Sequence, residues 1–119
     1  MSFKPPAGVA KEAQKGLRAR AKASPSKRGG LTNKEASAVG VGSGVQRATD
    51  LANRKNLSLS TVKRMKAFFA RHERNVVRAR QRGLRIQDSR ALQAWALWGG
   101  DAGKRWSERV VAREERKSK

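Results

Sequence analysis

The chain has 119 residues, about the size of one small domain with a modest hydrophobic core. Its 29 Lys and Arg residues outnumber 9 Asp and Glu residues and give a formal net charge of +20, which predicts a polyanionic partner. Because the chain has no Cys, one His and no recognisable catalytic set or cofactor motif, we expect a protein that is not an enzyme and binds no metal or cofactor.

A short helix is expected between Pro6 and the breaker SPSKRGG, because Pro5 and Pro6 suit a helix start. Its apolar positions recur every four residues: Val9, Ala13, Leu17 and Ala21. Its other faces carry Lys11, Lys15, Arg18, Arg20 and Lys22. Residues 1–39 are therefore interpreted as a basic N-terminal arm with a short helix, which either packs on the rest of the chain or orders only on a partner. Within it, Thr32 and Glu35 have capping-box spacing, so any helix there has one or two turns.

A second helix is predicted over Gln46–Arg54, and Asn56 is expected to end it in the left-handed conformation. The residues that it would bury are Val45, Ala48, Leu51 and Ala52. Ser58 or Ser60 then offers an N-cap for the next helix.

The stretch LSTVKRMKAFFARHERNVVRAR predicts one long helix from residue 59 to about Gly83. Apolar residues, with one His, follow alternating spacings of three and four: Val62, Met65, Phe69, His72, Val76 and Ala79. This row of residues, which we call the seam, packs either in the protein's own core or against a partner copy in a homo-oligomer. His72 is interpreted as a buried, hydrogen-bonded core residue rather than a metal ligand or pH switch.

Basic residues crowd the same stretch and have almost no acidic neighbours except Glu73. They are Arg64, Lys66, Arg71, Arg74, Arg78, Arg80, Arg82 and Arg85, of which Arg64, Arg71, Arg78 and Arg85 recur every seven residues. Such charges repel one another unless an anion compensates them, and Arg suits bidentate phosphate contact. The pattern favours a nucleic-acid surface over a merely solvated face.

The segment LANRKNLSLSTVKRM has the spacing of a helix-turn-helix, with Ala52, Asn56, Leu57, Val62 and Met65 at the required positions. In that case the second helix would enter the major groove and present Ser60, Thr61, Lys63, Arg64 and Ala67. The alternative is an ordinary helical hairpin that does not touch DNA. The candidate DNA-binding residues are Ser60, Thr61, Lys63, Arg64, Lys66, Arg71, Arg74, Arg78, Arg82 and Arg85.

After a break at RIQDS, with Asp88 or Ser89 as N-cap, a helix is predicted over RALQAWALW. Gly99 and Gly100 end it and Asp101 restarts a last helix, so GGDAG is interpreted as a helix break and not a phosphate loop. The three Trp residues, Trp95, Trp98 and Trp106, are expected in the core rather than on a base-stacking platform. The sequence thus predicts an all-α fold of four or five helices, with a compact domain over 40–112 and a fraying basic tail over 113–119.

The pair LSLSTVKRMKAFFARHE and AWALWGGDAGKRW resembles a small domain encoded by many tailed bacteriophages, in which a segment similar to GVQRATDL precedes them. The resemblance covers roughly residues 40–107 and implies a phage origin, with a place among virion genes. This chain departs from the pattern after Glu73, where an Arg-rich helical extension replaces a glycine-containing loop.

These observations predict a phage-encoded double-stranded DNA-binding protein that acts mainly through phosphate contacts. The alternative is a structural virion protein, associated with capsid or connector, whose basic face meets packaged DNA or an acidic virion or host protein. MSFKPPAG lacks the apolar run of a signal peptide, and no apolar run is long enough for a bilayer. We therefore expect no membrane partner and a location in the host bacterial cytoplasm, with the nucleoid, or in the virion interior.

Overall fold

The computed structural model describes residues 2–29 and 44–117, and within these residues the fold is all-α with one small sheet. The elements in chain order are β1 (Ser2–Phe3), α1 (Ala7–Lys22), the 3-10 turn η1 (Pro25–Lys27), α3 (Gly44–Ala52), β2 (Leu57–Ser58), α4 (Leu59–Gln81), the 3-10 turn η2 (Ile86–Asp88), α5 (Arg90–Leu97) and α6 (Gly100–Lys117). The all-α prediction is confirmed. The short helix expected near Thr32 lies outside the described residues.

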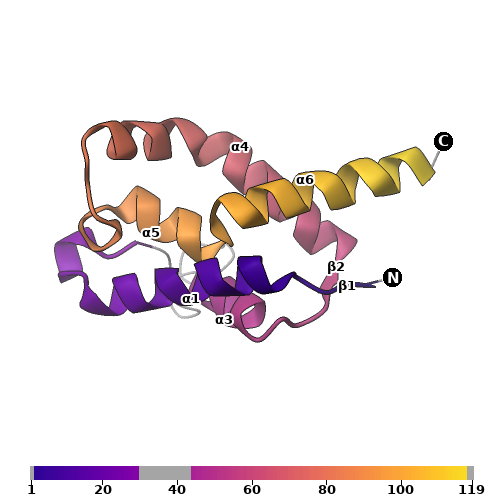
Figure 1. Ribbon diagram of the computed structural model, residues 1–119, viewed down its shortest axis with the longest axis horizontal. Helices are drawn as coiled ribbons and strands as arrows, with labels where there is room; N and C mark the ends of the chain where they lie inside the picture. The colour runs from indigo at the N-terminus through magenta and orange to yellow at the C-terminus, as the bar shows by residue number, and fades with distance from the viewer. Residues whose placement is uncertain (1, 30–43, 118–119) are drawn as a thin grey trace.

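The helices form layers, with α5 and the start of α6 between α1 on one side and α4 on the other (Figure 1). α1 packs chiefly on α3, α5 and α6, whereas α4 packs on α5 and α6. β1 and the C-terminal end of α6 lie towards the same end of the molecule (Figure 1). This arrangement leaves the outer faces of α1 and α4 in solvent.

The N-terminal segment is a packed helix and not a separate arm, which decides between the two alternatives for residues 2–29. Val9 and Ala13 are fully buried, and a Cβ on Gly16 would lie 2.7 Å from the Leu97 backbone nitrogen. α1 therefore approaches α5 more closely than a larger side chain at position 16 would allow.

Hydrogen bonds from Gln93 of α5 hold the end of the N-terminal segment, at Lys27 and Gly29, in place. Its buried side-chain amide donates to the carbonyls of Lys27, Ile86 and Gln87, and its Oε1 accepts from the Gly29 amide at 2.8 Å. Nearby, Arg90 Nε donates to the Ser26 carbonyl. The bonds to Ser26, Lys27 and Gly29 join residues more than sixty positions apart in the chain, so they hold residues 26–29 against the compact domain.

A two-stranded antiparallel sheet, which the sequence analysis did not predict, joins the N-terminus to the start of α4. Phe3 lies opposite Leu57, and both side chains are buried. The turn between α3 and β2 differs from the prediction. α3 ends at Ala52, and Arg54 rather than Asn56 has a positive φ, of 52°. Arg54 Nε also donates to the Pro5 carbonyl at 2.8 Å, which fixes this turn against the N-terminal segment.

The apolar seam of α4 is used within the chain. Val62, Met65, Phe69, Val76 and Ala79 are buried as predicted, and Phe68, which the sequence analysis left out, joins them. Ser58 is the N-cap, since its hydroxyl accepts from the Thr61 amide. The expectation that His72 is buried is wrong: it lies at the edge of the seam, half-exposed, with its ring 4.5 Å from that of Phe68.

The break between α5 and α6 lies where the sequence predicted it, and α6 extends further than predicted. Ser89 caps α5, and Gly99 and Gly100 take positive φ values of 113° and 63° between the helices. Trp95 and Trp106 are buried, as expected of core residues. α6 runs on to Lys117, five residues past the predicted domain boundary at residue 112. Glu114 remains buried in this last part, whereas Glu115, Arg116 and Lys117 are exposed.

Candidate nucleic-acid interface

The outward face of α4 carries a stripe of basic side chains, which we call the α4 ridge. Its six members are exposed and occupy one side of the helix, opposite the buried seam: Lys63, Arg64, Arg71, Arg74, Arg78 and Arg82, the last at the C-cap. At a rise of about 1.5 Å per residue the ridge extends about 28 Å. That length approaches one turn of B-DNA, about 34 Å. The ridge can therefore follow successive backbone phosphates without bending.

The carboxylates on and around α4 do not neutralise this ridge, because each forms an ion pair with a cation outside it. The pairs are Glu73 with Lys104 (3.7 Å), Asp101 with Arg80 (3.1 Å), Asp88 with Arg85 (2.6 Å) and Asp50 with Arg47 (3.4 Å). Among the described residues, none of the six ridge side chains makes an ion pair. Six uncompensated charges on one helix face repel one another and are stabilised by a bound polyanion.

Three basic residues predicted on this face lie elsewhere. α4 ends at Gln81, so Arg85 follows the turn at Gly83 and pairs with Asp88 instead of extending the heptad stripe. Arg80 turns towards α6 and pairs with Asp101. Lys66 is exposed, but it lies on the same side of α4 as Glu73, seven residues further along the chain, and not on the side of the ridge. The assignment of Arg85 to the helix face is thus corrected.

The structure gives little support to base reading by a helix-turn-helix. α3 packs mainly on α1 and α5, and α4 packs on α5 and α6, so α3 and α4 are not each other's main packing partners. Leu57 is buried in β2, and Leu59 is partly buried against the core. The hydroxyls of Ser60 and Thr61 both lie within hydrogen-bond distance of the Ser58 hydroxyl, in the cap of α4. Of the predicted base-reading residues, Lys63 and Arg64 remain fully available as part of the ridge.

A row of stacked groups borders the ridge, and the sequence analysis missed it. The Arg47 guanidinium lies 5.9 Å from the ring of Trp98, which stacks on Phe68 at 4.6 Å, and His72 follows. Burial, more than the nearby charge of Arg64, lowers the pKa of Arg47, although Asp50 opposes this. Burial and then the charge of Arg71 lower the pKa of His72. The positive charge of the ridge therefore contributes to the lowered pKa of both neighbours, Arg47 and His72.

Beside the C-terminal end of the ridge lies a shallow cleft of about 250 Å³. Arg78 and Arg82 line it from α4, and Asn75 and Ser89 add polar groups. This cleft widens the basic surface from α4 towards the start of α5.

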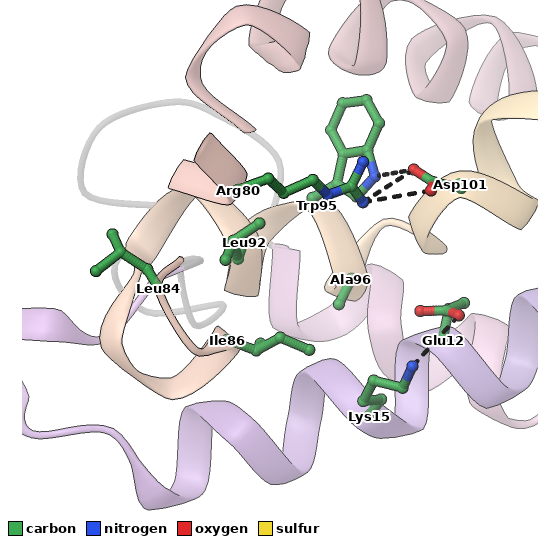
Figure 2. Close-up of a pocket in the computed structure, with 9 residues that line it drawn as sticks. All are labelled: Glu12, Lys15, Arg80, Leu84, Ile86, Leu92, Trp95, Ala96 and Asp101. Carbon is green, nitrogen blue, oxygen red and sulfur yellow. Dashed lines mark hydrogen bonds and ion pairs between the residues drawn. The ribbon is translucent and has the colours of Figure 1, made fainter. Parts of the chain in front are cut away.

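A second, deeper pocket of about 350 Å³ lies between α1, α5 and the start of α6 (Figure 2). Its charged groups are already paired: Asp101 accepts from Trp95 Nε1 at 2.8 Å and from Arg80, and Glu12 pairs with Lys15. Burial raises the pKa of Asp101, but the bonds from Trp95 and Arg80 outweigh it and leave that pKa below its ordinary value. Asp101 thus anchors the first turn of α6 to its neighbours.

The fold and this surface together define a small, strongly basic all-α protein with one long cationic helix face. Comparison with protein-family models, curated proteins and solved structures found no match. The resemblance to a tailed-phage domain therefore stays a prediction. Within residues 2–29 and 44–117, no cluster of three or more metal-ligand side chains is present. In the same part of the chain, no helix combines the length and apolar character needed to cross a bilayer.

Proposed function

We propose that the protein binds double-stranded DNA of a tailed bacteriophage or its bacterial host through the α4 ridge, mainly by contacts to backbone phosphates. The observation that carries this proposal is the ridge itself: six exposed cations whose nearest carboxylates are paired with other residues. Binding to phosphates releases condensed counterions, and this release supplies most of the affinity of such contacts.

Four observations about α4 support a backbone-directed mode. The ridge rests on a rigid helix whose other side is locked into the core by Met65, Phe69 and Val76, so the cations are positioned before DNA arrives. Five of the six are Arg, which suits bidentate phosphate contact. Small residues, Ala67 and Ala70, lie on the exposed face between them and admit close approach of the duplex. With the hydroxyls of Ser60 and Thr61 engaged in the helix cap, the proposal expects weak discrimination between sequences.

The test is fluorescence anisotropy with random and AT-rich duplexes over a range of salt concentrations. Six phosphate contacts predict a log–log slope of affinity on salt of about −5, with similar affinity for both duplexes. A slope near zero on both duplexes would contradict the proposal.

A further inference from the structure

A second basic stripe lies on α1. Lys11, Lys15, Arg18 and Lys22 follow spacings of four, three and four residues, which place them on one exposed side of the helix. Lys15 pairs with Glu12 at 3.5 Å. The other three, which we call the α1 stripe, make no ion pair among the described residues. Arg18 and Lys22, with Lys15, also line a cleft of about 240 Å³ against η2.

The α1 stripe and the α4 ridge face opposite ways. α1 buries Val9, Ala13 and Gly16 against the α5 and α6 layer, and α4 buries its seam against the same layer from the other side. Figure 1 shows the two helices on opposite edges of the molecule with α5 between them. Each basic face therefore lies on the side of its helix that points away from the shared α5 and α6 layer, and one folded chain presents both.

One duplex cannot lie along both faces. The protein measures 46 × 32 × 26 Å, so a duplex in contact with both would have to turn back around it within a few helical turns. Bending 20–30 base pairs by only 40–90° already costs about 1–6 kcal/mol, because DNA is stiff over about 150 base pairs. Two separate segments reach the two faces without this cost.

We infer that one copy of the protein bridges two DNA segments, the first on the α4 ridge and the second on the α1 stripe. This inference rests on the proposed function of the ridge. Three uncompensated cations against six make the α1 stripe the weaker face, with a salt slope of about −3 against about −5. Bridging should therefore disappear at a lower salt concentration than binding to one duplex.

The test is a recovery assay with a biotin-labelled duplex on beads and a second, fluorescent duplex in solution. Wild-type protein is expected to recover the fluorescent duplex, with a maximum at intermediate protein concentration because excess protein saturates each duplex separately. The key variant replaces Lys11, Arg18 and Lys22 by Gln. A charge-matched control replaces Arg105, Arg109 and Arg113, three exposed residues of α6, by Gln. All substituted side chains are exposed, so both variants should fold, as circular dichroism can verify.

The α1 variant is expected to recover at least about tenfold less duplex than the α6 control, while anisotropy on a single duplex changes by no more than about threefold. If the α1 variant recovers as much as the control, bridging does not use α1 and arises from self-association or from the ridge alone, which overturns the inference. If wild-type protein binds one duplex but recovers none, the inference fails and the proposed function stands. Failure to bind even a single duplex would instead refute the proposed function.

Discussion

Replacing Arg64, Arg71, Arg74 and Arg78 by Gln removes four of the six ridge charges and leaves the buried side of α4 untouched. Because these side chains are exposed and Gln propagates a helix about as well as Arg, the free energy of unfolding should change by less than about 0.5 kcal/mol. The variant therefore removes the basic surface while it keeps the fold.

The size of the effect follows from the number of contacts. With six ridge contacts the slope is about −5, so affinity falls about a thousandfold between 50 and 200 mM salt. The variant retains two ridge cations, and its next best surface is the α1 stripe with three. Its slope should therefore be about −3 or shallower, with a fall of about a hundredfold or less over the same range.

The assay is a salt-titrated anisotropy measurement on a fluorescent duplex, with a charge-matched control. The control replaces Arg105, Arg109, Arg113 and Arg116 on α6 by Gln, so that both proteins have the same net charge. At about 100 mM salt the ridge variant should bind at least about a hundredfold more weakly than the control. Equal affinities and equal slopes for the two variants would refute the reasoning, because net charge rather than the ridge would then determine binding.

Four further predictions concern stability and are checked by urea unfolding. Gln93→Leu roughly keeps the side-chain volume but removes the partner of the buried Gly29 amide and of three part-buried carbonyls, so we expect a loss of about 3 kcal/mol; a loss under about 1 kcal/mol would contradict this role. Gly16→Ala, which raises helix propensity by about 1 kcal/mol, should nevertheless destabilise the protein because its Cβ would meet the Leu97 nitrogen at 2.7 Å; a stabilised variant would refute the close approach. The lowered pKa of Asp101 predicts that stability falls in acid, as pH drops below the ordinary Asp pKa and the unfolded chain takes up the proton first; Asp101→Asn should flatten this decline. The pKa of His72 is also lowered, so stability should decrease as pH falls through about 6.5, and an unchanged profile in His72→Gln would show that another group is responsible.

The local elements could be predicted from the sequence because their signals are local. The seam of α4, the caps at Ser58 and Ser89, and the helix break at Gly99 each depend on neighbours a few residues away. The burial of Trp95 and Trp106 followed from the shortage of other large apolar residues. Spacing along one helix likewise identified all six ridge residues, five of them in α4 and Arg82 at its C-cap.

What the sequence did not reveal depends on contacts between distant segments. The bonds of Gln93 to residues 27–29 and the pairing of β1 with β2 join segments more than fifty residues apart, and neither leaves a periodic pattern. A helical Gly at position 16, beside Ala13 and Ala19, was the one available signal that α1 packs closely on another element. Arg85 was misplaced because the heptad was extended past Gly83, where the chain turns.

The measurement that tests the central claim most directly is nuclear magnetic resonance of the labelled protein titrated with a short duplex, observing backbone amides and Arg side-chain Nε–H groups. The account predicts that the Nε–H signals of Arg64, Arg71, Arg74 and Arg78 shift first, and that these shifts reverse when salt is raised. Shifts centred on another surface, with the ridge signals unmoved at saturating duplex, would contradict it.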